Sequence, residues 1–185
     1  MPQPGSQETG GKRGLLMVIT GNGKGKTTAA FGLALRAAGH GLRVIVIQFM
    51  KGSPNYGEYL AAREHLSGLV SVEQYGRAEF VVKGSPLQVD VDHAHRGLAR
   101  AREVLADGAF DLVVLDEINV AMDFGLLSWS EVEGLLAGRN AAVDVLLTGR
   151  YAPGALVQMA DQVSEILDIK HHFADGIPAR EGIEY

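Results

Sequence analysis

A glycine-rich loop between a predicted strand and a predicted helix constrains the fold of this chain more than any other feature. Residues 21–28 read GNGKGKTT, follow the apolar run 15–19 and precede a helix-forming stretch at 29–36. Glycines let the backbone turn so that successive N–H groups point at one anion, and the following helix adds the positive end of its dipole. This order of strand, loop and helix predicts a phosphate-binding loop.

Two side chains of the loop suit a nucleotide with its metal ion. Lys26 supplies a cation for phosphates, and the Thr27 hydroxyl can ligate Mg²⁺. The usual pattern places four residues between the first glycine and Gly-Lys-Thr, whereas only three separate Gly21 from Gly25. Either Thr20 takes the first position, or the loop is a variant.

Composition bounds the organisation of the chain. With 185 residues, 46% of them hydrophobic, the chain is long enough for one core and too short for two ordinary domains. Residues 1–14 are rich in Pro, Gly, Gln and Ser, which predicts a flexible N-terminal tail. We therefore expect one domain over residues 15–185.

Charge and composition also exclude several classes of function. A net charge of -5 argues against a general nucleic-acid binder, which needs a basic face. The absence of cysteine excludes disulfides, Cys-ligated zinc and a thiol nucleophile in this chain. No apolar run is long enough for a membrane span or resembles a secretion signal, so we expect a cytoplasmic protein with no membrane partner.

Short apolar runs alternate with helical patterns along the rest of the chain. Several of the runs are apolar throughout, as in parallel strands with helices on both faces. The pattern predicts an α/β fold of the P-loop NTPase-like (RecA-like) class, with a mostly parallel sheet of about six strands and the nucleotide at their carboxyl ends. The expected strands are 15–20, 43–49, 70–75, 112–116, 144–148 and 163–169, and the expected helices are 26–38, 56–65, 89–106, 130–136 and 153–160.

The strand expected at 112–116 ends in two adjacent carboxylates, Asp116 and Glu117. In a P-loop protein an acid at this position holds Mg²⁺ directly or through water. Because strand side chains alternate, only one of the pair is expected to touch the metal. The alternative is that the two residues merely end the strand.

Several further segments carry a resemblance to a known family, and they extend to the last residue. They are residues 20–32, 48–52 with Gly57 and Glu58, 114–119, 148–150, 160–165 and 163–185. With these segments the chain resembles the P-loop type of corrinoid (ATP:cob(I)alamin) adenosyltransferases of cobalamin biosynthesis.

The resemblance implies an alkyl transfer and a set of site residues. Cobalt(I) of cob(I)alamin, or of the precursor cob(I)yrinic acid a,c-diamide, attacks the 5′-carbon of ATP and releases triphosphate. It implies ATP as co-substrate, Mg²⁺ or Mn²⁺, a flavoprotein reductant for cobalt and a homodimer. Lys26 is the expected catalytic cation, Thr27 and Glu117 the expected metal ligands, and Asp116 lies behind them. The expected nucleotide contacts are Gly21, Asn22, Gly23, Lys24, Gly25, Lys26, Thr27 and Thr28, with Arg36 as a weaker one.

The family is thought to displace the lower axial ligand of cobalt with aromatic side chains near the third strand. Here that segment offers Tyr75 and Phe80 and no tryptophan. A flat apolar group beneath the corrin would deny room and hydrogen bonds to a water ligand. Packing in the core is the alternative for both. Lys51 and Glu58, in the loop after the second strand, are further expected contacts of substrate.

Two other classes of function share the nucleotide motifs. One is an ATP hydrolase or small kinase, and the other is a non-catalytic module that binds ATP or a corrinoid. Free triphosphate as product separates the transferase from the first, and turnover separates it from the second.

Overall fold

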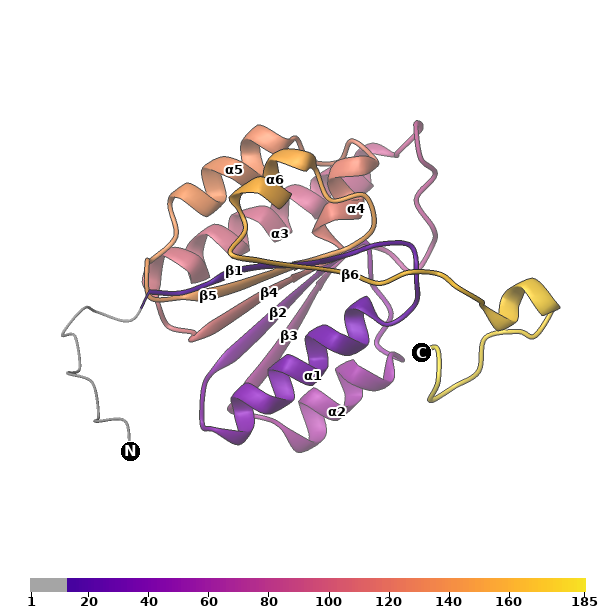
Figure 1. The fold of residues 1–185 in the computed structure, drawn as a ribbon, viewed down its shortest axis with the longest axis horizontal. Helices are drawn as coiled ribbons and strands as arrows, with labels where there is room; N and C mark the ends of the chain where they lie inside the picture. The colour runs from indigo at the N-terminus through magenta and orange to yellow at the C-terminus, as the bar shows by residue number, and fades with distance from the viewer. Residues whose placement is uncertain (1–12) are drawn as a thin grey trace, which may run out of the picture.

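The computed structural model describes residues 13–185, and its centre is one six-stranded parallel sheet (Figure 1). The strand order is β3-β2-β4-β5-β1-β6, with parallel pairing throughout. The carboxyl ends of all six strands therefore meet at one edge of the sheet. The strands are β1 (Leu16–Thr20), β2 (Val44–Phe49), β3 (Val70–Tyr75), β4 (Leu112–Asp116), β5 (Asp144–Thr148) and β6 (Gln162–Glu165).

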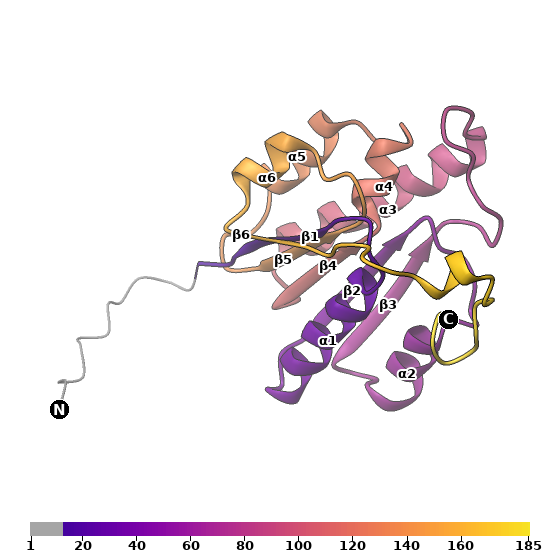
Figure 2. The ribbon, with the colours of Figure 1, turned by 45° about the vertical axis from the view of Figure 1, so that its right-hand side comes forward.

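Helices cover both faces of the sheet, as Figures 1 and 2 show from two directions. One face carries α1 (Lys26–Gly39) and α2 (Gly57–His65). The other carries α3 (Gln88–Asp107), α4 (Ile118–Asp123), α5 (Trp129–Ala137) and α6 (Gly154–Met159). A short 3₁₀ helix, η1 (His172–Asp175), lies in the extended stretch after β6. Among residues 13–185 no helix has the length and apolar character needed to cross a membrane.

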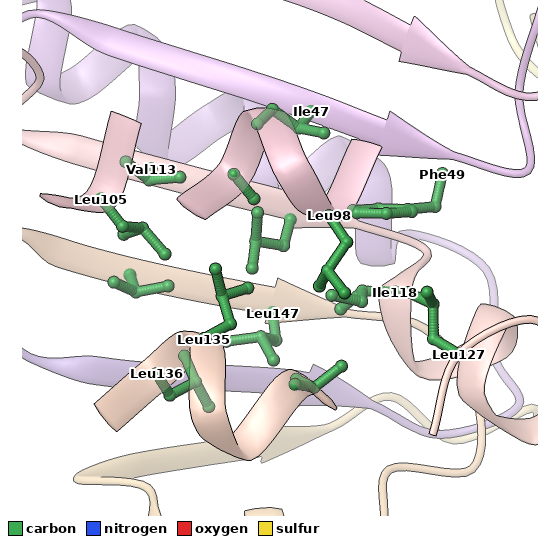
Figure 3. Close-up of a cluster of buried hydrophobic side chains, with 14 of the residues drawn as sticks. Ile47, Phe49, Leu98, Leu105, Val113, Ile118, Leu127, Leu135, Leu136 and Leu147 are labelled. Carbon is green, nitrogen blue, oxygen red and sulfur yellow. The ribbon is translucent and has the colours of Figure 1, made fainter. Parts of the chain in front are cut away.

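The central strands are buried on both sides, which explains their unbroken apolar sequence. Every residue of β2 and β4 is buried. Alternate residues face opposite helix layers: Ile47 and Phe49 contact the cluster built with α3 and α5, whereas Val44 and Val46 face α1. Figure 3 shows Ile47 and Phe49 beside Leu98 and other side chains of the first cluster. The side chains that α1 buries in the second cluster are all alanines, which lets the helix lie close to the sheet.

These observations confirm the predicted α/β class, the parallel sheet and the helices on both faces. Three elements differ from the prediction, one of them the short η1, which was not expected. The last strand ends at Glu165 and not at residue 169. The six-residue α4 was not expected, because it begins directly after β4 through Glu117, a non-glycine residue in the left-handed region with φ 63°.

The predicted tail, residues 1–14, lies outside the described residues except for its last two. Gly14 is packed against the protein: its N–H donates to the Ala141 carbonyl at 2.7 Å, and a β-carbon on Gly14 would overlap the backbone of Val143. Arg13 pairs with Asp161 at 2.5 Å. Residues 13 and 14 thus contact the domain that was expected to begin at residue 15.

Candidate active site

The glycine-rich loop lies at the carboxyl edge of the sheet, between β1 and α1. Lys26, the first residue of α1, is buried, and its Nζ donates to the carbonyl oxygens of Gly21 at 2.8 Å and Gly23 at 2.6 Å. Burial lowers the pKa of Lys26, and the nearby Glu117 opposes this shift. The loop therefore fixes one ammonium group at the N-terminus of a helix, where an anion is favoured.

Two glycines of the loop are needed for contact with the chain that follows β6. A β-carbon on Gly21 would overlap the Ile166 carbonyl, and one on Gly23 would overlap that of Leu167. The Gly23 N–H donates to the Ile166 oxygen at 2.8 Å. This N–H is engaged within the protein, whereas the prediction assigned Gly23 to the phosphate cradle. Gly25, with φ 118°, starts α1 in a conformation that favours glycine.

Asp116, at the end of β4, is fully buried and accepts hydrogen bonds from four side chains. Its Oδ1 accepts from the Thr148 hydroxyl at 2.7 Å and the Thr27 hydroxyl at 3.0 Å. Its Oδ2 accepts from Lys51 Nζ at 3.0 Å and Gln48 Nε2 at 3.1 Å. The carboxylate thus fixes side chains from the loop and from both neighbouring strands.

Gln48 and Thr148 had no role in the sequence prediction. Gln48 is the one polar residue in the buried strand β2, and Thr148 ends the buried strand β5. The sequence signal for both residues was a polar side chain near the carboxyl end of an otherwise apolar strand. Such a side chain lies at the same edge of the sheet as Asp116.

Glu117 has a different environment from its neighbour. Its N–H donates to the Thr148 hydroxyl at 3.0 Å, and the residue lines the cavity described below. Burial, and then the charge of Asp116, raise the pKa of the Glu117 carboxyl, while Lys51, Lys26 and Arg150 oppose the shift. A buried carboxylate beside a second one is stabilised by a cation.

The side-chain oxygens of Thr27, Asp116 and Glu58 suit a cation, because the ammonium group of Lys51 already lies among them. Lys51 Nζ lies 3.1 Å from the Thr27 hydroxyl, 3.0 Å from Asp116 and 3.6 Å from Glu58. Burial lowers the pKa of Lys51, but the carboxylate of Asp116, together with those of Glu58 and Glu117, more than offsets this, so the pKa is raised. Within residues 13–185 no group of three or more His, Cys, Asp or Glu side chains could hold a metal. A Mg²⁺ site made of one hydroxyl, one carboxylate, phosphates and water needs no such group.

A cavity of about 1250 Å³ is lined both by the loop and by apolar and aromatic side chains. Its charged and polar lining includes the loop with Lys51, Glu58, Lys83, Glu117, Arg150, Asp168 and His171. Its apolar and aromatic lining comes from segments far apart in the sequence: Phe31, Met50, Tyr56, Phe80, Val81, Val120, Phe124, Tyr151, Phe173, Ile183 and Tyr185. A smaller cavity of about 330 Å³ lies behind the loop and is lined in part by Thr20, Gly21 and Glu165.

The structure brings most of the predicted residues to the large cavity. Its lining includes residues 22–28, with Lys51, Glu58, Phe80 and Glu117, whereas Asp116 lies buried behind them. Phe80 is 98% exposed, at the rim. The chain places Arg150, which the prediction did not select, on the loop after β5 in the lining of the same cavity. The sequence signal that could have identified Arg150 is a basic residue two positions after the end of a strand, as for Lys51.

Besides the buried Asp116, and Gly21, which lines the smaller cavity, two further predicted residues lie apart from the large cavity. Arg36 is exposed in the C-terminal part of α1, and neither Arg36 nor Tyr75 is among the lining residues. The Tyr75 hydroxyl donates to Glu73 at 2.8 Å. The Tyr75 ring lies so close to Gly97 of α3 that a β-carbon at residue 97 would be 3.1 Å from it. Burial raises the pKa of Tyr75 to about 12. The position of Tyr75 corresponds to the alternative weighed from the sequence, a packing residue.

Comparison with solved structures supports the fold. The chain is similar to the flagellar accessory protein FlaH from Methanocaldococcus jannaschii, with a TM-score of 0.52 over 84% of this chain and 72% of that one. The sequence identity is 15%, so this similarity concerns the fold alone.

Comparison with known sequences covers nearly the whole chain. A corrinoid adenosyltransferase from Pseudomonas aeruginosa is 39% identical over 174 residues, which is 94% of this chain and 85% of that protein. The corrinoid adenosyltransferase of Escherichia coli K12 and CobA of Salmonella typhimurium are each 38% identical, over 94% of this chain and 87% of theirs. The model of the family described as ATP:corrinoid adenosyltransferase BtuR/CobO/CobP matches residues 12–185. This chain belongs to that family.

Proposed function

We propose that this chain transfers the 5′-deoxyadenosyl group of ATP to the cobalt(I) of a corrinoid, cob(I)alamin or cob(I)yrinic acid a,c-diamide, and releases triphosphate. The observation that carries the proposal is one cavity lined both by the glycine-rich loop and by many apolar and aromatic side chains. An enzyme that alkylates a large flat cofactor with ATP needs both surfaces in one space. The relatives, named corrinoid adenosyltransferases, support the same activity.

The reaction requires stabilisation of its leaving group, triphosphate. The electron pair of cobalt(I) forms the bond to C5′, the bond from C5′ to the triphosphate oxygen breaks, and its electrons leave with the triphosphate. Negative charge therefore develops on that oxygen. Lys26, Arg150 and the N-terminus of α1 lie where they would stabilise this charge. Asn22, Gly25 and Thr28 line the same side, with Lys51 and Glu58 next to them.

Thr27 and Glu117 are the residues that would hold Mg²⁺ or Mn²⁺. The buried Glu117 carboxyl with its raised pKa and the cation already seated near Thr27 both fit this assignment. A metal ion bound there supplies charge neutralisation for the triphosphate. Asp116 orients Thr27 through its hydrogen bond and does not need to touch the metal.

The corrin ring would bind against the apolar and aromatic residues of the cavity lining. Phe80, Val81 and Phe124 line this side of the cavity, and they offer surfaces that exclude water from the cobalt. We assign Phe80 to the lower face of the ring. Tyr75 and Arg36, which lie apart from the lining, receive no contact in this proposal.

One anaerobic experiment tests the function. The protein is mixed with ATP, Mg²⁺ and chemically reduced corrinoid, the loss of the cob(I) spectrum is followed, and triphosphate is assayed. We expect spectral loss and triphosphate formation in equal amounts. Phosphate and ADP in place of triphosphate would indicate a hydrolase, and binding without any product would indicate a non-catalytic module; either result contradicts the proposal.

We also propose a homodimer that acts in the cytoplasm and receives electrons from a flavoprotein. These three points follow the resemblance to the family and are tested separately. Light scattering gives the number of subunits, cell fractionation gives the compartment, and replacement of the chemical reductant by a reduced flavoprotein tests the electron donor.

A further inference from the structure

The phosphate-binding loop carries a lysine besides Lys26. This residue, Lys24, is hydrogen-bonded to residues near the C-terminus. Lys24 Nζ donates to the Ile183 carbonyl at 2.9 Å and to Glu184 Oε1 at 2.8 Å. Lys26, two residues on, donates to carbonyls of the loop itself. The two cations of the loop therefore have different partners, although the sequence suggests the same role for both.

Glu184 is held from several directions. Its Oε2 accepts from the Arg180 N–H at 2.7 Å, and its Oε1 lies 3.4 Å from His172 Nε2. Hydrogen bonding to Lys24, the largest cause, lowers the pKa of the Glu184 carboxyl to about 2. A turn in which the Gly182 N–H donates to Tyr185 at 2.8 Å completes this C-terminal segment, residues 182–185.

The C-terminal segment forms one side of the large cavity, to which all four of its residues contribute. Figures 1 and 2 show the chain leaving the sheet after β6 and returning beside the N-terminal end of α2. There a β-carbon on Gly57 would lie 3.9 Å from the Tyr185 carbonyl. Because no strand pairing follows Glu165, the place of this segment depends on contacts such as those of Lys24.

We infer that Lys24 is a positioning residue that holds residues 182–185 in place as one wall of the large cavity, and does not contact the triphosphate. The inference rests on the proposed function for its substrate. It follows that loss of the Lys24–Glu184 pair from either side, by Lys24→Ala or by Glu184→Gln, changes the kinetics in the same way, because both variants release the same wall.

Reversal of the two charges separates this role from phosphate binding. Lys24→Glu and Glu184→Lys each break the pair, and each is expected to lower kcat/KM by about tenfold, a modest change of free energy. The double variant restores a pair of opposite charges and should recover part of the loss. If Lys24 served the triphosphate, Lys24→Ala would raise the KM for ATP and Glu184→Gln would leave it unchanged; that result would overturn the inference.

Hydrogen exchange provides a second test that needs no substrate and no activity. In Lys24→Ala and Glu184→Gln, the amides of residues 183–185 should exchange at least about tenfold faster than in the wild type, since local opening costs less free energy. Lys170→Ala is the matched control, because Lys170 pairs with the exposed Asp175 in the same stretch of chain and should leave these amides unchanged. Unchanged exchange in the first two variants would sink the inference. The exchange result stands even if the wild type forms no triphosphate, so failure of the proposed function is seen separately.

Discussion

At the scale of single residues, Asp116 and Glu117 show how two adjacent carboxylates acquire opposite physical roles. Asp116 is surrounded by four donors, so its charge is compensated where it lies. Glu117 is destabilised by burial and by Asp116. Substitution should therefore affect stability at the first position and activity at the second.

We predict that Glu117→Gln keeps or slightly raises the thermal stability and lowers kcat by about 10²–10³-fold, as for loss of one group that serves charge stabilisation. Asp116→Ala should lower the free energy of unfolding by about 3–5 kcal/mol, because it leaves the buried Gln48 and the partly buried Lys51 without this carboxylate. Thermal melts and steady-state kinetics measure both effects. A Glu117→Gln protein that is fully active would remove this residue from the metal site.

Lys26 and Arg36 provide a second contrast within one helix. Lys26→Ala removes the ammonium fixed over the loop and should reduce turnover by at least about 10²-fold. Arg36→Ala changes an exposed residue apart from the cavity lining and is the matched control, with turnover close to wild type. The assay is triphosphate release at saturating corrinoid. Near-normal product formation by Lys26→Ala would contradict the assignment of Lys26.

At the scale of elements, the loops after β2 and β3 meet backbone to backbone. A β-carbon on Gly76 would overlap the backbone of Lys51, and one on Gly52 would overlap the Gly76 carbonyl. Only glycine at both positions allows this contact. The contact sets the relative position of Lys51, which is bonded to Asp116, and of the loop that carries Phe80.

We predict that Gly76→Ala lowers the free energy of unfolding by about 1–3 kcal/mol, as overpacking does, and reduces kcat/KM for the corrinoid. Gly134→Ala is the control, because Gly134 lies inside α5 with no atom near the added carbon. It should stabilise the protein by about 0.5–1 kcal/mol. Thermal melts measure the expected loss of stability in Gly76→Ala and the expected gain in Gly134→Ala. A Gly76→Ala protein with wild-type stability and kinetics would show that the loops yield without cost.

The contact between α3 and α5 includes a pair whose strength depends on pH. His95 Nε2 lies 3.0 Å from Glu131 Oε1, and His95 Nδ1 lies 2.9 Å from the Val91 carbonyl. The hydrogen bond to Val91, and then Glu131, raise the pKa of His95 above 6.5. A raised pKa means that the contribution is complete below about pH 6.5 and is lost as pH rises through the folded pKa.

We therefore predict that the melting temperature of the wild type exceeds that of His95→Gln by more at about pH 6 than at about pH 8. At both values Glu131, whose pKa is lowered mainly by Ser128, stays ionised. Both side chains are more than a third exposed, at 45% and 38%, so the effect should stay below about 1 kcal/mol. The same difference at both pH values would show that the histidine stays uncharged.

At the scale of the whole molecule, local patterns predicted the elements, and contacts between distant segments decided the site. Apolar strands and the glycine-rich loop are local, so the six strands and the position of Lys26 followed from the sequence. The short helix α4 did not, because it depends on the left-handed conformation of Glu117. The partner of Lys24 is 160 residues away, and no local pattern specifies such a pair.

Distant contacts also explain why the glycines of the loop were only partly understood from sequence. Their spacing predicted an anion site, yet Gly21 and Gly23 are also required by the close approach of Ile166 and Leu167. The order of the strands brings β6 next to β1 and makes this approach possible. These two glycines thus have a structural requirement beside the anion site predicted for the loop.

Ligand binding should stabilise the molecule as a whole, because the loop, Glu117 after β4 and the C-terminal segment all line one cavity. At a concentration of ATP with Mg²⁺ about 100 times the dissociation constant, the folded state gains about 2.7 kcal/mol. For a chain of this length that gain corresponds to a rise in melting temperature of about 5–10 °C. Removal of Mg²⁺ with a chelator should reduce the rise, and Glu117→Gln should reduce it to the value seen without metal. Lys26→Ala should show little rise under either condition. If the wild type melts at the same temperature with and without ATP and Mg²⁺, the cavity is not a nucleotide site; a full rise in Glu117→Gln would place the metal on other residues.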